Sequence, residues 1–598
     1  MERKRGKRMW KDFVDEVLET DVLIIGGGAA GLRSAIEARD KGSDVTLLAK
    51  GSIPGGASVM AAFIAGGMGE ESGTPQEHFE DTILGGAYMN NQRLVRILVE
   101  DAPQRIKELE KWGMLFARDI PTHYIAVREG GHRYPRLVHS AGKGSGNRVP
   151  QVLFEQALAK GVKFRFFVFT TSLIKRGEEV VGATAIDMKT GRFIFVHAKT
   201  TILATGGTSK IYNRGACARL NTGDGFSMAL RAGAELANME FMQYIPLGII
   251  NDGSADGYTL GGTPKAKEGY LYNSMGERFM KRYDPVWMEK ANRARMTVAI
   301  AKEIKEGRGC KRGGVLVDLT RIKEEEKAHR LKYQPYFPFC LREIYGDKVG
   351  DFLEPYEVKP TALFQNGGVR INERCETTLQ GLLAVGEVTC GLHGANRLGG
   401  NAQAECLVFG KIAGQRAAER AKEVGLGEVE EETIWMARER AFAALNRKEG
   451  VHPRKLKEQI QGIMMEYVGP LRSEEGLQQA FTTLKEIKEK EGFLFTQGKS
   501  RIMNFEWMEA LEMSSMVELA LVMTEGALFR KESRESHYRE DYPEHFPGGD
   551  NENWAVETVV SSKDGKIKID KVPVVFDEIK PGEFEVKKVD VPYQTFRA

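Results

Sequence analysis

The sequence has few cysteines, no long apolar run and almost no net charge. Its six cysteines are scattered over 598 residues without a CxxC pair, which argues against an iron–sulfur, zinc or other metal site in this chain and for reduced thiols. No window approaches the roughly 18 consecutive apolar residues that a membrane span needs, and the charged first residues carry no signal-peptide pattern. The net charge of +3 provides no global basic field for nucleic acid. We expect a cytoplasmic protein that reaches a membrane only through a partner.

A strand–turn–helix near the N-terminus is the first positive signal. Residues 20–26 (TDVLIIG) predict a buried parallel strand, residues 32–41 a helix and residues 44–48 the next strand, which together make one βαβ unit. Glycine-rich turns are common, so the turn at 26–31 is weak evidence by itself. Its place after a strand and before a helix favours dinucleotide binding over a purely structural turn.

The turn reads GGGAAG and fits the dinucleotide-binding fingerprint. Gly26 permits the tight turn, Gly28 lets the backbone approach a pyrophosphate, and Gly31 lets the helix pack on the strand. The pyrophosphate would rest on backbone N–H groups at the start of the helix, where Ala29 and Ala30 lie.

One expected feature of such a site is missing. An acidic residue usually ends the second strand and holds a ribose, but Ala49-Lys50-Gly51 stands there. Backbone groups or Lys50 would have to replace it. Residues 55–75 are rich in Gly, Ala and Ser, and we interpret them as a loop that runs close to the ligand, with candidate contacts at Gly56, Ala57 and Ser58.

The rest of the chain changes character several times. Short strands are predicted at 163–169, 180–187 and 200–204. Glycine-rich turns and charged helices between 236 and 355 indicate an inserted domain, and 361–420 return to strand, glycine turn and helix. Helical spacing of Glu, Lys, Leu and Met over 430–530 predicts a bundle, and the tail after Trp554 alternates like a strand or hairpin.

Several motifs, taken together and in order, resemble the flavoprotein subunits of the succinate dehydrogenase/fumarate reductase family, which includes L-aspartate oxidase. The HGANRLG run is the most specific, and with the C-terminal motif it makes a chance match implausible. The motifs are GGGAAGL (26–32), LATGG (203–207), NTGDG (221–225), MEFMQY (239–244), GERFMKRY (276–283), GLLAVGE (381–387), HGANRLGGNA (393–402) and ESRESHYREDYP (532–543).

The resemblance implies an α/β fold in which a Rossmann-like FAD-binding domain is split in sequence. Its two parts would be residues 1–235 and 356–425, with an α+β capping domain at 236–355 between them. A C-terminal helical domain would cover 430–545, and a tail with a strand or hairpin would cover 546–598. A carboxylate substrate would bind between the cap and the flavin, with hydride passing between flavin N5 and a carbon next to the carboxylate.

The resemblance also implies flavin contacts. Glu387 would contact the ribityl chain or ribose, and Asn401 and Ala402 would lie at the isoalloxazine edge. The FAD cavity would be lined by Ala204, Thr205, Gly206, Gly207 and Asp224. In much of the family a histidine bonds covalently to the flavin; Ala57 takes its place here, so we expect noncovalent FAD.

The family binds its substrate carboxylate with two arginines and two histidines, and arginine suits this work because its planar fork stays charged and binds a carboxylate bidentately. Arg397 matches one arginine and would also reach the cofactor. Arg293 matches the arginine that the family uses as the proton donor, and His393 is kept.

Other positions depart from the family. Its His-Pro-Thr-Gly motif reads Ile-Pro-Leu-Gly at 245–248, a later histidine falls on Leu363, and its proton-relay Thr-Glu-Gly segment reads Gly-Gly-Thr at 261–263, followed by Lys265. Buried carboxylates need donors, and losing them costs several kcal/mol. We therefore expect a changed substrate, a larger or less charged acid such as a monocarboxylate or an ester. New polar groups could come from Tyr244, Tyr270, Tyr272 and Lys265.

Three functions stay open from the sequence. The first is an FAD-dependent reductase or dehydrogenase acting on a carbon–carbon bond of a carboxylate-type substrate. The second is an electron-transfer subunit of an iron–sulfur complex with a vestigial pocket, and the third is an L-aspartate oxidase. Because the chain has no cysteine cluster, we expect an iron–sulfur electron-transfer subunit as partner.

Overall fold

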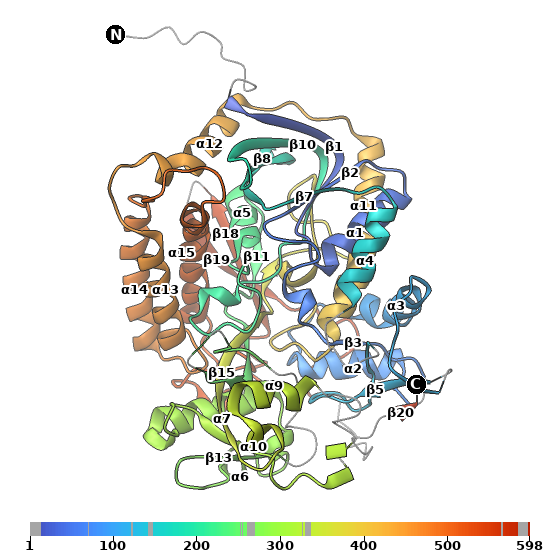
Figure 1. Cartoon of the computed structure of the whole chain (residues 1–598), viewed down its shortest axis with the longest axis vertical. Helices are drawn as coiled ribbons and strands as arrows, with labels where there is room; N and C mark the ends of the chain where they lie inside the picture. The colour runs from blue at the N-terminus through green and yellow to red at the C-terminus, as the bar shows by residue number, and fades with distance from the viewer. Residues whose placement is uncertain are drawn as a thin grey trace.

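The computed structural model in Figure 1 describes most of the chain. Helices α13 to α15 run along one side, the largest sheet and α12 lie at the upper end, and α6, α7, α10 and β13 lie at the lower end. The described residues are 13–69, 71–120, 123–140, 148–251, 253, 255–259, 269–325, 327–328, 336–563, 566–583 and 596–597.

The largest sheet is built on the predicted βαβ unit. Its order is β7-β2-β1-β10-β9-β8, with β17 also paired to β10. The pairs joining β7, β2, β1, β10 and β17 are parallel, whereas β9 and β8 are antiparallel additions. The strands are β1 (Glu16–Ile25), β2 (Val45–Ala49), β7 (Lys163–Phe166), β8 (Val168–Arg176), β9 (Glu179–Asp187), β10 (Arg192–Leu203) and β17 (Leu382–Ala384).

Helices from two distant segments of the chain cover this sheet. Helix α1 (Ala29–Asp40) packs along α11 (Asn401–Glu423), and a Cβ added at Gly414 would lie 2.4 Å from the Ser34 carbonyl oxygen, so the two backbones approach closely. The structure thus unites two distant segments in one Rossmann-like α/β domain. Further helices of this part are α2 (Pro75–Gly85), α3 (Gln92–Lys111), α4 (Val149–Ala159) and α5 (Asp224–Ala232).

The segment predicted as a loop close to the ligand is partly structured. It contains a short 3-10 turn, Ala57–Val59, and strand β3 (Phe63–Ala65), which pairs with β6 (Leu137–His139). Tertiary pairing overrides the weak local signal of this Gly- and Ala-rich stretch. The same sheet holds β5 (His123–Val127), β4 (Arg118–Ile120) and β20 (Phe596–Arg597).

A separate antiparallel sheet organises the middle of the chain, in the order β12-β15-β14-β13. Its own hydrophobic core includes Leu271, Ile300 and Val317. The strands are β12 (Met242–Ile249), β13 (Tyr270–Tyr272), β14 (Val315–Asp318) and β15 (Tyr356–Gln365), and the helices are α6 (Met280–Tyr283), α7 (Arg293–Glu303), α9 (Tyr336–Tyr345) and α10 (Asp347–Gly350). Strand β15 begins at Tyr356, so this sheet extends beyond residue 355, where we expected the capping domain to end. The positions 261–263 and 265 lie outside the described residues.

The C-terminal part is helical and then returns to strands. Helices α12 (Glu431–Asn446), α13 (Pro453–Tyr467) and α14 (Glu474–Glu491) are grouped with α15 (Phe505–Phe529), most of whose residues are buried. The tail hairpin, β18 (Val556–Lys563) and β19 (Lys566–Pro573), joins β11 (Leu236–Ala237) and β16 (Gly368–Val369) in one sheet. The tail hairpin therefore packs on this chain. Within the described part of the chain, no helix is both long and apolar enough to span a membrane.

Candidate functional site

The glycines of the fingerprint turn sit where a side chain cannot fit. Gly26 has φ +125°, and a Cβ added there would lie 2.0 Å from the carbonyl oxygen of Ala204, at the end of β10. A Cβ at Gly31 would lie 2.0 Å from the carbonyl oxygen of Gly26. These two glycines let β1, α1 and the end of β10 meet at one point, the carboxyl edge where nucleotides bind in such sheets.

The start of α1 suits an anion. Its first turn has no acidic residue, and the Gly28 N-cap provides no side-chain bond. The Ala29 N–H donates to Ser58 Oγ at 3.1 Å, which brings the 55–58 loop against the helix start. Gly56 has φ +70° with open space where a Cβ would be. The positive end of the helix dipole and the small side chains around it fit the pyrophosphate of a dinucleotide.

Glu387 lies next to the end of β10. A Cβ added at Gly207 would lie 2.0 Å from Glu387 Oε1, and this oxygen accepts a hydrogen bond from the Gln365 N–H at 3.1 Å. Burial raises the pKa of Glu387 to about 7, against the lowering effect of that N–H and of Arg397. The buried Thr205 Oγ1 has no hydrogen-bond partner among the described residues. A buried carboxyl and an unsatisfied hydroxyl fit a polar ligand such as the ribityl chain.

Two predicted cofactor ligands have partners inside the protein. Lys50 Nζ lies 2.8 Å from Asp224, 2.6 Å from Glu512 and 2.8 Å from Thr222 Oγ1. An ammonium group has three protons, so these contacts leave none for a ribose hydroxyl. The structure thus gives Lys50 and Asp224 a role in joining the FAD domain to α15, and their contact with the cofactor stays a prediction.

Asn401, the first residue of α11, is held by two residues of α2. Its Oδ1 lies 2.8 Å from His78 Nε2, and its Nδ2 donates to Thr82 Oγ1 at 3.1 Å. The neighbouring His132 Nε2 donates to the Gly399 carbonyl oxygen at 2.9 Å. Sequence reasoning missed both buried histidines, since they lie far from this loop in the chain. They orient the loop that leads to Asn401 and Ala402.

Arg397 is buried beside aromatic and amide groups. Its Nη2 donates to Gln243 Oε1 at 3.2 Å, and its guanidinium lies 4.8 Å from the ring centroid of Phe364. Burial and the nearby Arg293 lower its pKa to about 9. Its Nε is buried and has no partner among the described residues, so this guanidinium keeps a donor for a ligand.

Arg293 begins helix α7 and reaches across to the FAD domain. Its Nη2 lies 2.6 Å from Glu129 Oε2, and its Nη1 lies 3.5 Å from the Arg397 carbonyl oxygen. Glu129 also lies against the glycine loop, because a Cβ at Gly399 would be 2.0 Å from Glu129 Oε2. The structure therefore brings Arg293 and Arg397 together, with a carboxylate that sequence reasoning missed.

His393 is close to Arg397 but is turned toward α11. Its Nε2 lies 3.0 Å from Glu405 Oε2, and its ring packs edge-on against Phe364 with 5.1 Å between centroids. Its Nδ1 is buried without a partner among the described residues. Glu405 follows Asn401 by one helical turn, a spacing that could have identified it as part of the same helix face.

Two paired strands carry the apolar residues that stand where the resemblance places histidines. Ile245 is on β12 and Leu363 on β15, and the register pairs Tyr244 with Ala362 between them. Beside them, the ring of Phe364 faces both Arg397 and His393. The Tyr244 hydroxyl instead bonds to the Val468 carbonyl oxygen at 3.4 Å, in the helical part. Tyr244 is therefore a core residue, and our suggestion that it supplies a substrate contact finds no support.

Comparisons with known proteins identify the family of this chain. The family described as FAD binding domain matches residues 21–402, and the one described as fumarate reductase flavoprotein C-term matches residues 457–588. A fumarate reductase (CoM/CoB) subunit from Methanothermobacter marburgensis is 36% identical over 89% of this chain and 96% of its own. The Escherichia coli quinol fumarate reductase FrdA superposes with a TM-score of 0.87 at 28% identity, over 95% of this chain and 99% of FrdA.

A third relative is named differently. Sdh1 of Mycobacterium smegmatis is 32% identical with a TM-score of 0.83, over 94% of this chain and 95% of its own. The chain is an FAD-dependent oxidoreductase that belongs to the fumarate reductase/succinate dehydrogenase flavoprotein family.

Proposed function

We propose that this protein reduces the carbon–carbon double bond of an unsaturated acid that carries one carboxylate. The observation that supports this is the charge of the arginine cluster. Arg293, Arg397 and Glu129 together carry one positive charge for the ligand. The nearby Glu387, whose pKa burial raises to about 7, does not add a full negative charge. The family's histidine positions are apolar here, at Ile245 and Leu363. A second substrate carboxylate would be buried without donors, which costs several kcal/mol.

Each residue has a part in the proposed reaction. Bound FAD supplies hydride transfer at its N5 atom. Arg397 holds the substrate carboxylate, and Arg293 donates the proton that completes the two-electron reduction. Glu129, at 2.6 Å from Arg293, takes the place of the relay carboxylate expected at 261–263: after Arg293 has given up its proton, Glu129 takes a proton from solvent, passes it to that arginine and is ionised again.

Three compounds that share one double bond but carry two, one or no carboxylates test which charge the substrate has. The protein is reduced with dithionite without oxygen and mixed with fumarate, monomethyl fumarate or dimethyl fumarate, while flavin absorbance follows reoxidation. Monomethyl fumarate should react fastest, because its single charge matches the cluster. Faster reoxidation by fumarate would contradict the proposal. An L-aspartate oxidase would instead show flavin reduction by L-aspartate.

We further propose that the FAD is noncovalent and that electrons arrive through a partner. Ala57 offers no atom for a bond to the flavin, and acid precipitation should leave the flavin in the supernatant. Relatives of this chain are named as subunits. Purification from its source should therefore yield an iron–sulfur protein with it. Co-purification together with no reoxidation by any acid would favour the electron-relay alternative.

A further inference from the structure

A tight turn near the C-terminus is buried between the two segments that carry the arginines. The Arg534 N–H donates to the His537 carbonyl at 2.8 Å, and the His537 N–H donates back at 2.9 Å. Glu535 and Ser536 form the tip, and both are buried. Turns usually lie on the surface, so a turn whose polar tip is buried is unusual.

The Glu535 side chain holds the residue that caps α7. Asn292 Nδ2 lies 3.0 and 2.9 Å from the two Glu535 oxygens, while Asn292 Oδ1 accepts the Arg295 N–H at 3.0 Å. An ionised carboxylate can only accept hydrogen bonds. It therefore orients the amide so that its oxygen faces the helix, which is the orientation that an N-cap needs. The next residue, Arg293, is the first of the helix.

The Ser536 side chain holds the other segment. Its Oγ donates to the Ala395 carbonyl oxygen at 2.5 Å, and Ala395 lies two residues before Arg397 in the chain. One turn thus contacts the helix that starts at Arg293 and the loop that carries Arg397.

The backbone of the tip is strained for its sequence. Glu535 has φ +45°, a left-handed conformation in which glycine is more stable than a residue with a Cβ. The base of the turn holds it there, since Arg534 bonds to Glu532 at 2.8 and 2.9 Å and to the Ala87 carbonyl oxygen at 2.9 Å. A strained, buried, charged residue with defined partners points to a role for its side chain.

We propose that Glu535 and Ser536 are positioning residues that fix Arg293 relative to Arg397. This inference rests on the proposed function for its effect on rate. The contact between Glu535 and Asn292, which we call the clasp, does not depend on that function and can be measured separately.

The charge of Glu535 gives the clasp a pH dependence. Burial raises the pKa of Glu535 to about 7, opposed by Arg295, the Asn292 amide and Arg534. Arg295 is itself paired with Asp284 at 3.0 Å. Only the ionised carboxylate can accept from Asn292 through both oxygens, so the clasp should weaken as pH falls through about 7.

The test uses holoenzyme variants and two readouts. Glu535→Gly removes the clasp and relieves the backbone; it should speed hydrogen exchange over Asn292–Thr297 and slow flavin reoxidation about tenfold, with flavin still bound. Glu535→Gln keeps one acceptor and should give an intermediate rate that no longer falls below pH about 7. Asn292→Ser keeps a capping oxygen but cannot hold the carboxylate, and should resemble Glu535→Gly.

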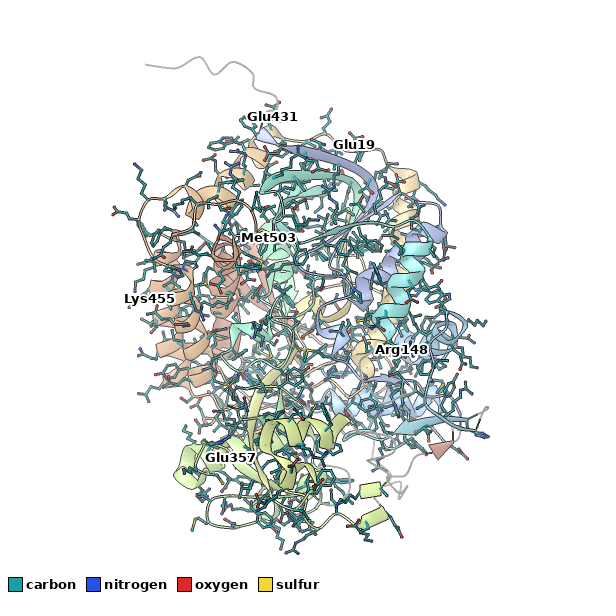
Figure 2. All side chains as sticks on the ribbon, in the orientation of Figure 1. Glu19, Arg148, Glu357, Glu431, Lys455 and Met503 are labelled. Carbon is teal, nitrogen blue, oxygen red and sulfur yellow. The ribbon has the colours of Figure 1, made fainter. Side chains whose placement is uncertain are left out.

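Met503→Gly is the matched control. Met503 has φ +48° and lies toward the opposite end of the molecule from Glu357 of the β15 sheet, as the labels in Figure 2 show. It should change neither readout. Unchanged exchange in Glu535→Gly and Asn292→Ser would overturn the clasp, and faster exchange with an unchanged rate would overturn the positioning role. If no acid reoxidises the flavin, the proposed function fails while the exchange data still decide the clasp.

Discussion

Two regions of the site are built in different ways: the glycine turn at 26–31 where we expect the flavin nucleotide, called the cradle, and the arginine cluster of Arg293, Arg397 and Glu129. The cradle consists mainly of backbone: Gly26 and Gly31 are needed because any side chain would meet a carbonyl oxygen at 2.0 Å. The cluster consists of side chains: Arg293, Arg397 and Glu129 come from three distant segments and meet through charge. A cradle of this kind tolerates almost no change, whereas a cluster of this kind can exchange its members and alter the substrate. This difference accounts for what the resemblance leads us to expect, namely flavin motifs that are kept while two histidine positions of the substrate site are apolar, at Ile245 and Leu363.

The largest effect should come from the cradle. Gly26→Ala places a Cβ against Ala204 in a left-handed conformation, which we expect to destabilise the fold by about 3 kcal/mol and to abolish flavin binding. Gly42→Ala is the control, because Gly42 also has a left-handed φ, +89°, but open space around it; it should cost only about 1 kcal/mol. Thermal unfolding and flavin content measure both. Equal effects of the two changes would remove the steric argument.

A change in the arginine cluster should lower the reaction rate without loss of the flavin. Arg293→Ala should lower the reoxidation rate constant by about a thousandfold, since it removes the donor of the proton, while flavin content stays normal. Arg293→Lys should not restore the rate, because a lysine cannot reproduce the guanidinium fork. Stopped-flow absorbance after anaerobic reduction gives the rate. Normal turnover in Arg293→Ala would refute the role assigned to this arginine.

Glu129 should have a smaller effect than Arg293. Glu129→Gln keeps the size of the side chain but cannot return a proton, so we expect a loss of about a hundredfold in rate. Glu100→Gln, which changes an exposed carboxylate on α3, is the control and should have no effect. Identical rates for wild type and Glu129→Gln would refute the relay role of Glu129, because glutamine can neither pass a proton nor carry the negative charge.

The last effect, which should be absent at neutral pH and appear only in acid, concerns the histidine that holds Asn401. Burial and the charge of Arg136 lower the pKa of His78 to about 3, against 6.5 for an ordinary histidine. The unfolded chain therefore binds a proton that the folded chain does not, and stability falls as pH drops from about 6.5 toward 3, by up to about 1.4 kcal/mol per pH unit. His78→Gln should reduce this acid sensitivity. If the free energy of unfolding falls by the same amount between pH 7 and pH 5 in wild type and in His78→Gln, His78 is not the source of the acid sensitivity.

The structure changed the interpretation of particular residues in both regions. Lys50 was a candidate ribose ligand because it follows a strand, yet its protons are taken by Asp224, Glu512 and Thr222. Glu512 is on a helix 462 residues later in the sequence, and no local pattern could reveal that contact. Glu129 was missed for the same reason, since its partner is 164 residues away.

The amino-acid sequence alone was enough to predict the βαβ unit, the glycine turn, the FAD cofactor and the family, because these depend on local backbone geometry and on motifs read in order. Which charges meet became known only from the folded chain: Glu129 with Arg293, Lys50 with Glu512, and Glu535 with Asn292. The physical reason is the distance along the sequence between a residue and the atoms that determine it. A glycine is required by atoms a few residues away, whereas an ion pair is set by the packing of whole domains, which brings together residues that have no relation in the sequence.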